Sequence, residues 1–187
     1  MKTSNLLTAC IFFYSINLFA QPGTLDSNFG SNGKVINPQG NGKTVAIQAD
    51  EKIVVGGSSA AGFTLVRYKS NGAIDKSFGI SGVAIADFGN EGIVNSIVIK
   101  PSGKIIAAGG DGKNFAVAKF NSNGTLDSSF GINGKVTTNF FGKRDEAKFV
   151  TFEPDNKIIV IGTAFDQNGE QSRIALARYK PDGTLDS

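Results

Sequence analysis

The sequence predicts an all-β protein built from repeated four-stranded sheets, and three observations support this. First, the segment GTLDSNFG at residues 23–30 returns as GAIDKSFG at 72–79 and as GTLDSSFG at 124–131. Second, each repeat holds four short β-prone runs separated by turn residues, a pattern typical of a β-meander. Third, no segment of the repeats has the apolar spacing of an amphipathic helix.

The repeats divide the chain into units of similar length. A fourth copy of the motif begins at Gly183 and reaches Ser187, so residues 21–187 form a repeat region. A fixed internal period of this kind dictates the architecture. The units span residues 23–71, 72–123, 124–182 and, truncated, 183–187.

The fourth β-prone run of each unit is apolar on both faces. In the first unit Phe63 and Leu65 point one way, and Val66 and Tyr68 point the other. Because no helix is available to cover either face, each sheet must pack against other sheets. Four-stranded sheets repeated about every 50 residues and packed face to face make a β-propeller.

We therefore expect a β-propeller fragment of about three four-stranded blades plus the start of a fourth, with blades beginning near Gly23, Gly72 and Gly124. A stacked β-solenoid is the alternative architecture. Since propellers close with about four to eight blades, we also expect the remaining blades to come from a longer chain. The aromatic residue that ends each motif should fill the space between blades: Phe29, Phe78 and Phe130.

The motif resembles a known repeat family. Residues 178–183 (RYKPDG), followed by Leu185 and Asp186 and completed by Phe-Gly in the earlier copies, resemble the delta-60 repeat. The resemblance extends from Gly23 to the end of the chain. It implies a propeller-like fold, export from a bacterial cell and a binding or scaffold role, and it supplies no catalytic residues.

Residues 1–20 are expected to be a secretory signal peptide. Lys2 is followed by an apolar stretch at residues 6–19, and Ala20 offers the small residue that cleavage requires. Polar residues interrupt the stretch, which disfavours a membrane span. We expect a secreted or cell-surface protein. Cys10, the only cysteine, lies in this leader, and lipidation there is the alternative to cleavage after Ala20.

Composition excludes several classes of function. The 19 basic and 16 acidic residues are scattered, giving a net charge of +3, which does not indicate nucleic-acid or membrane-surface binding. There is no histidine, so Ser-His and Cys-His nucleophiles and the usual zinc sites are excluded. We expect no enzymatic activity. The alternative is a carbohydrate-active propeller enzyme whose catalytic residues lie outside this fragment.

Loop length predicts a binding surface. The unit lengths differ only in the loops joining the first run to the second and the third to the fourth, and in an up-and-down meander these loops share one face. Repeat proteins often bind ligands where length variation concentrates; neutral drift is the alternative. We expect an unknown protein or glycan of the cell exterior to bind there. The candidate residues are Asp111, Lys113, Lys143, Arg144, Asp145, Glu146, Asp166, Gln167 and Glu170.

An aspartate recurs three residues after each repeated glycine. In this position a carboxylate can accept hydrogen bonds from the backbone of the turn that follows, so we expect a structural role. Calcium binding is the alternative, but calcium takes six to eight oxygens and each copy offers one or two carboxylates. We therefore expect no cofactor and no metal. The aspartates are Asp26, Asp75, Asp127 and Asp186.

Overall fold

A computed structural model describes residues 23–88, 92–141, 144–166 and 168–187. The predicted signal peptide, Cys10, Lys143 and Gln167 lie outside the described residues. All regular secondary structure in these ranges consists of β-strands. No helix long and apolar enough to cross a membrane is found in the described residues.

The strands form three antiparallel sheets, here called sheets 1, 2 and 3. Sheet 1 contains β1 (Asn41–Ile47), β2 (Ile53–Ser59), β3 (Gly62–Tyr68) and β4 (Val83–Ala86). Sheet 2 contains β5 (Ile93–Ile99), β6 (Ile105–Gly110), β7 (Phe115–Phe120) and β8 (Lys135–Thr138). Sheet 3 contains β9 (Glu146–Phe152), β10 (Ile158–Phe165) and β11 (Ser172–Tyr179).

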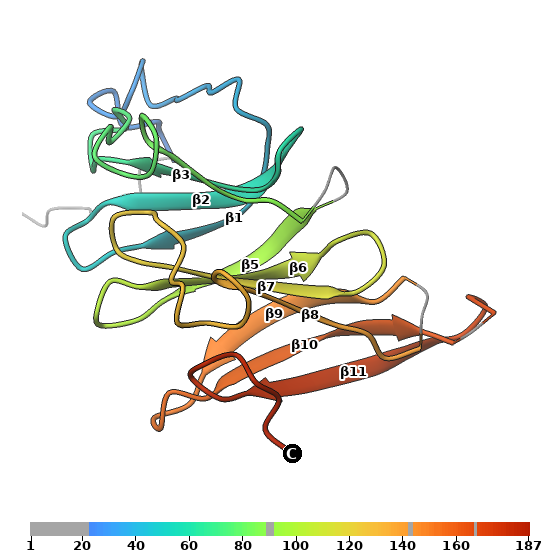
Figure 1. Ribbon diagram of the computed structural model, residues 1–187. Helices are drawn as coiled ribbons and strands as arrows, with labels where there is room; N and C mark the ends of the chain where they lie inside the picture. Colours follow the sequence, from blue (N-terminus) through green and yellow to red (C-terminus); the bar gives the residue numbers. More distant parts are fainter. Residues whose placement is uncertain (1–22, 89–91, 142–143, 167) are drawn as a thin grey trace, which may run out of the picture.

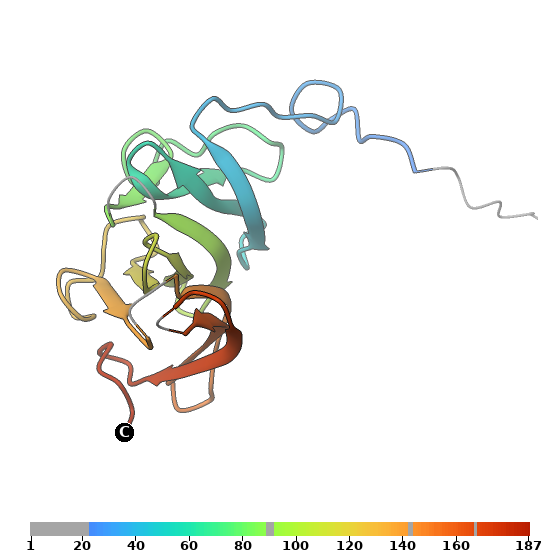
Figure 2. The same cartoon turned by 90° about the vertical axis from the view of Figure 1, so that its right-hand side faces the viewer.

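The sheets pack face to face in chain order. Figure 1 shows sheet 1 at the top of the stack and sheet 3 at the bottom, and the perpendicular view in Figure 2 shows the same order. The first strands of successive sheets contact one another, β1 with β5 and β5 with β9. Successive meanders that meet along their first strands are the blades of a propeller, so the predicted fold class is confirmed.

The sheets are offset from the sequence repeats. The sequence predicts blades that begin at the repeated glycine, and this is wrong: the run that follows each glycine completes the preceding sheet, as Val83 pairing with Val66 shows. The reason is a backbone anchor. Asp75 N donates to Arg67 O at 2.9 Å, and Arg67 N donates to Gly82 O at 3.0 Å. The motif therefore stays beside β3, and β4 adds to that edge.

Because of this offset, the first β-prone run of the chain belongs to no sheet, and sheet 3 lacks a fourth strand. Residues 34–36, the first β-prone run of the first unit, form only isolated bridges at Lys34, because no strand of the described residues precedes them to pair with. Sheet 3 has three strands instead of the predicted four, and the outer edge of β11 has no ladder partner in the described part of the chain.

Two apolar cores lie between the sheets, one on each side of sheet 2. Phe78 is fully buried in the core between sheets 1 and 2, and Phe130 is fully buried between sheets 2 and 3. Both therefore fill the space between blades, as predicted. Phe29 is only half buried, because it covers the free face of sheet 1, where no further sheet packs within the described residues.

The motifs of successive repeats contact each other through their backbones. Gly79 N donates to Asn123 O at 2.7 Å, and Gly131 N donates to Asp182 O at 2.7 Å. Gly124 has a φ of +87°, and a Cβ at this position would lie 2.6 Å from Gly79 N. Only glycine suits both the left-handed backbone and the close approach, which explains why this residue recurs.

The repeated phenylalanines should differ in their contribution to stability. We expect Phe130→Ala to lower the free energy of unfolding by about 3–5 kcal/mol, because it empties a packed core. Phe29→Ala occupies the same motif position but removes a half-buried ring, so about 1 kcal/mol is expected. Urea unfolding of both variants and the parent measures this, and equal losses would contradict the packing described here.

Candidate functional site

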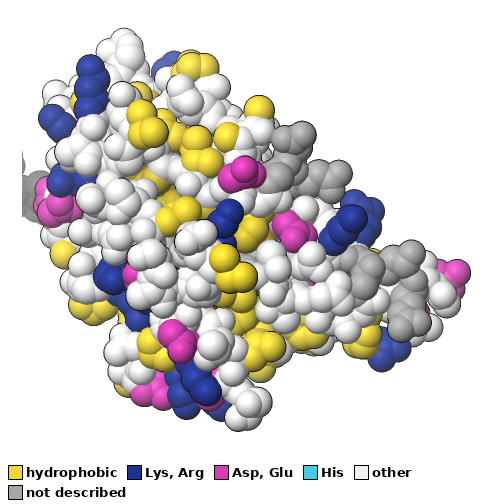
Figure 3. Space-filling model, in the orientation of Figure 1, with side chains coloured by type: hydrophobic (Ala, Val, Ile, Leu, Met, Phe, Trp, Pro, Cys, Tyr) yellow, Lys and Arg dark blue, Asp and Glu magenta, His cyan; other side chains and the backbone are white. Residues whose placement is uncertain are grey.

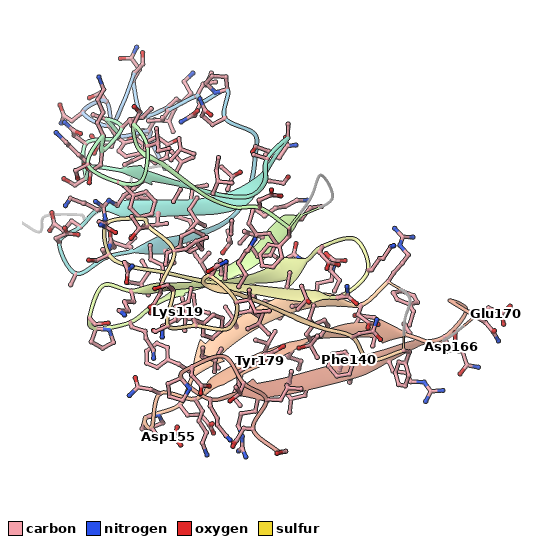
Figure 4. All side chains as sticks on the ribbon, in the orientation of Figure 1. Lys119, Phe140, Asp155, Asp166, Glu170 and Tyr179 are labelled. Atoms are coloured by element: carbon pink, nitrogen blue, oxygen red, sulfur yellow. The ribbon has the colours of Figure 1, made fainter. Side chains whose placement is uncertain are left out.

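The connections of different length lie at one end of the sheets. Because the strands alternate in direction, the loops after β2, β4, β6, β8 and β10 share this end, here called the loop end. The tight turns after β1, β5 and β9 share the opposite, turn end. In Figure 4 Asp166 and Glu170 mark the loop end of sheet 3, and Asp155 marks its turn end.

A groove of about 1210 Å³ crosses the loop end and is lined by residues of all three sheets. Figure 3 shows acidic and basic side chains mixed at this end, to the right of the view. The lining residues are Gly40, Asn41, Ser58, Ser59, Ala60, Ile93, Gly110, Gly112, Lys113, Arg144, Asp145, Glu146 and Phe165.

The structure brings four of the predicted binding residues together in this groove: Lys113, Arg144, Asp145 and Glu146. Three others are not part of its lining: Asp111, Asp166 and Glu170. Asp111 closes its own loop, since its Oδ1 accepts hydrogen bonds from Lys113 N at 2.9 Å and Asn114 N at 2.7 Å. Asp166 Oδ1 likewise accepts from Glu170 N at 2.9 Å.

The sequence gives no signal for three lining residues that lie at strand ends rather than in loops. Ile93 begins β5, Gly110 ends β6 and Phe165 ends β10. They reach the groove because the ends of β5, β6 and β10 lie at the loop end. Loop spacing alone does not reveal this proximity.

Asp145 joins two loops of the groove. Its backbone N donates to Lys113 O at 2.8 Å, and its Oδ2 accepts from Phe140 N at 2.7 Å. The residue is 1% exposed, and its Oδ1 is buried with no hydrogen-bond partner. Asp145 therefore fixes the loop after β8 against the loop after β6.

Glu146, on β9 of sheet 3, connects this strand to β5 of sheet 2. Its Oε1 accepts from Asn95 Nδ2 at 2.7 Å, and its Oε2 pairs with Lys148 Nζ at 2.8 Å. Asn95 reaches across because it lies at the bulge of β5. Burial opposes ionisation of Glu146, but the hydrogen bonds from Lys148 and Asn95 outweigh it and lower the pKa of this carboxyl.

The groove also carries two cations that form no ion pair among the described residues, although the charge of Arg144 contributes to the lowered pKa of Glu146. Lys113 and Arg144 are exposed, and neither forms an ion pair with any residue that the structure describes. The carboxylates beside them are buried or engaged: Asp145 Oδ2 accepts from Phe140 N, Asp145 Oδ1 is buried, and Glu146 is held by Lys148 and Asn95. The positive charge available to a ligand therefore comes from these two side chains.

The turn end carries a cluster that repeats in every sheet. In each copy the motif aspartate pairs with a basic residue of the third strand and with the lysine before the second strand. In the second copy Asp127 Oδ2 lies 2.8 Å from Lys104 Nζ and 3.2 Å from Lys119 Nζ. The clusters are Asp75 with Arg67 and Lys52, Asp127 with Lys119 and Lys104, and Asp186 with Arg178 and Lys157.

The same aspartates accept hydrogen bonds from the turn that follows them. Asp75 Oδ1 accepts from Ser77 Oγ at 2.7 Å and from Ser77 N at 3.2 Å. The hydrogen bond from Ser77 outweighs burial and, with the charges of Arg67 and Lys52, lowers the pKa of Asp75 to about 2. The ion pairs were not predicted, although the recurrence of a basic residue in the third strand of each sheet is a signal for them.

The basic partners also bear on the calcium alternative. The described ranges hold no group of three acidic or other metal-ligating side chains able to bind an ion. At Asp127 a calcium ion would have to displace two ammonium groups from the same carboxylate oxygen. The cluster is built for cationic side chains, and its basic residues also cover the motif aromatic: the Arg67 guanidinium lies 4.5 Å from the centre of the Phe78 ring.

Comparison with known families identifies the repeat. The sequence model of one family, a domain of unknown function called the DUF5122 β-propeller, matches residues 48–78, 100–130 and 153–187. Together these make up just over half of the chain. Each match begins at or beside a tight turn and contains the second and third strands and the motif that follows. No curated protein matches the chain.

Loss of a motif aspartate should depend on the cluster around it. We expect Asp127→Ala to lower the free energy of unfolding by about 3 kcal/mol, because it leaves the buried Lys119 ammonium without its partner. Asp26→Ala is the matched control: Asp26 is exposed, and within the described residues its side chain accepts a hydrogen bond from Asn28 N, so about 1 kcal/mol or less is expected.

Urea unfolding measures both losses. Thermal unfolding with and without a chelator should give the same melting temperature for the parent protein, since cationic side chains hold these carboxylates. A fall in melting temperature that calcium restores would contradict this and favour the calcium alternative.

The pKa of Asp75 predicts an acid-sensitive step. Its folded-state pKa of about 2 lies below the ordinary value of 3.8, so the ionised carboxylate stabilises the fold above about pH 4. This contribution is lost as the pH falls from about 4 to about 2. Circular dichroism melts across this range should show a steeper fall in melting temperature for the parent than for Asp75→Asn; equal slopes would contradict the assignment.

Proposed function

The chain belongs to the DUF5122 β-propeller family, and we propose that it is an exported, non-enzymatic repeat scaffold that binds a partner in the loop-end groove. Export is inferred from residues 1–20, which have the charge and apolar pattern of a signal peptide. The resemblance of the motif to the delta-60 repeat supports the same location, at the cell surface or outside the cell.

One observation carries the proposal: the connections after β2, β6 and β8 line a single groove at the loop end, where the connections that vary between repeats lie, while the connections of constant length lie at the opposite end. Loops held by a rigid scaffold are where proteins usually place binding residues. A groove of this size is large enough for an extended chain rather than a single small metabolite.

The charges favour an acidic ligand. Lys113 and Arg144 line the groove and form no ion pair among the described residues. Acidic groups of a bound chain, whether a protein segment or a glycan, would pair with them. The glycines of the lining leave backbone groups accessible, which suits hydrogen bonding to an extended ligand.

The carboxylates of the groove support a non-enzymatic role. Hydrolysis of a glycoside uses a pair of carboxyl groups, one of them protonated and with a raised pKa. The pKa of Glu146 is lowered by Lys148 and Asn95 despite burial, so Glu146 is poorly suited to donate a proton. Asp145 is buried and holds the backbone of its own loop.

Arrays of acidic glycans and acidic peptides test the proposal. The parent protein should retain a subset of them, and the double variant Lys113→Glu with Arg144→Glu should bind that subset at least about tenfold more weakly, since it replaces attraction by repulsion at two contacts. The matched control is Lys69→Glu with Lys76→Glu, which changes the charge equally in the linker at the turn end and should bind as the parent does.

Equal binding by the groove variant and the control would contradict the proposed site. Mass spectrometry of the retained ligands should find no product. Turnover of a retained glycan would contradict the non-enzymatic role and favour the carbohydrate-active alternative.

A further inference from the structure

The tight turns at the turn end share one backbone structure but differ in charge. They occupy residues 48–52, 100–104 and 153–157, with the sequences QADEK, KPSGK and EPDNK. In each turn the N–H of the first residue donates to the carbonyl of the last residue, at 2.8–2.9 Å. The side chains of the three turns can therefore be compared position by position.

The first position of the turn does not need a cation for folding. It is Gln48 in sheet 1, Lys100 in sheet 2 and Glu153 in sheet 3, so a neutral, a basic and an acidic side chain all fit the same turn. Lys100 is nevertheless only 8% exposed. Because a buried ammonium group costs free energy unless an opposite charge compensates it, the turn itself does not explain this lysine.

The third position of the turn lacks a carboxylate in sheet 2 alone. In sheets 1 and 3 an aspartate at this position pairs with the lysine two residues later, at 2.8 and 3.3 Å between the carboxylate oxygen and Nζ. In sheet 2 the position is the exposed Ser102. Lys104 therefore pairs with Asp127 alone among the residues that the structure describes.

Three ammonium groups and one carboxylate lie together at the turn end of sheet 2, where Figure 4 labels Lys119. Asp127 Oδ2 lies 2.8 Å from Lys104 Nζ and 3.2 Å from Lys119 Nζ. Lys100, in the same turn as Lys104, donates to the neutral Asn156 Oδ1 at 2.9 Å and forms no ion pair within the described ranges. This cluster therefore has two positive charges in excess, whereas its counterparts in sheets 1 and 3 each pair two cations with two aspartates.

The excess charge acts on Lys100. Burial is the largest cause that lowers the pKa of its ammonium group, and the charges of Lys119 and Lys104 lower it further. An anion placed among the three groups would compensate the mutual repulsion and the cost of burial together.

The ammonium groups keep donors for such an anion. Each has three N–H donors, and the hydrogen bonds of the described residues use one on Lys100, to Asn156, and one on Lys104, to Asp127. Lys119 donates to Pro181 O at 3.0 Å. The residue at the position of Lys119 in sheet 1 is an arginine, which uses all three of its guanidinium nitrogens within its own cluster.

A pocket of about 690 Å³ gives access to the cluster from the turn end. Lys100 and Ser102 line it, and its acidic lining residue Asp50 is already paired with Lys52. The side chain of Lys104 is 38% exposed. A small anion can therefore reach the cluster from solvent and find the Ser102 hydroxyl as a further donor.

We propose that Lys100, Lys104 and Lys119 bind a tetrahedral dianion, the group that sulfate, phosphate and their monoesters share. The two excess positive charges match the two negative charges of this group. Lysine binds such groups as a point charge, whereas planar carboxylates are better matched by the fork of an arginine. The site lies at the opposite end of the sheets from the loop-end groove, so it does not depend on the ligand proposed there.

Isothermal titration calorimetry of the full chain with inorganic phosphate and with sulfate, at constant ionic strength, tests the proposal. The parent should bind one dianion per chain. Lys100→Gln with Ser102→Asp should bind it at least about tenfold more weakly, because this double variant removes both excess charges. The new residues are those of the equivalent positions in sheet 1, so the turn should still form, and circular dichroism shows whether it does.

The matched control is Lys69→Gln with Ser70→Asp, which makes the same charge change in the exposed linker after β3 and should bind as the parent does. Methyl phosphate distinguishes the two sources of the group. If it binds as tightly as inorganic phosphate, the site accepts a group carried by a larger ligand, and if only the inorganic ions bind, the ligand is the free ion. A parent that binds neither ion, or equal affinities of the two double variants, would overturn the proposal.

Discussion

The rest of the structure depends on one requirement: every sheet is apolar on both faces, and no helix within the described ranges covers either of them. Each sheet must therefore be covered by another sheet, and each junction is closed by one phenylalanine of the motif. In the second repeat this phenylalanine is positioned by the backbone hydrogen bond from Asp75 to Arg67 and by the ion pair of the same two residues. The contacts within the motif and the packing of the sheets therefore depend on each other.

The contacts that hold the motif lie at the turn end, and none of them involves the loop end. The aspartate clusters, the glycine contacts and the tight turns recur in nearly the same form in each repeat. The connections at the loop end make none of these contacts, so they can differ in length without disturbing the packing of the sheets. Asp145 is the clearest exception, since it joins two loops through Lys113 O and Phe140 N.

Features that follow from periodicity were predictable, and features set by single contacts were not. Alternating apolar residues and the recurring Phe78 and Phe130 predicted blades with aromatic residues between them. The offset of the sheets depends on which edge the motif stays beside, and that is decided by the backbone bonds of Arg67, which leave no mark in the sequence pattern. For the same reason loop spacing located Lys113 and Arg144 in the groove but not Phe165, which reaches it from a strand end.

The offset between repeat and sheet has a consequence for how such chains change in evolution. Each of sheets 1 and 2 is assembled from two successive repeats, so no repeat is an independent folding piece with a boundary of its own. A gene duplication or deletion one whole period long, wherever its breakpoints fall, joins like to like and preserves every strand order. The number of blades can therefore change by whole repeats while the existing contacts between neighbouring blades are kept.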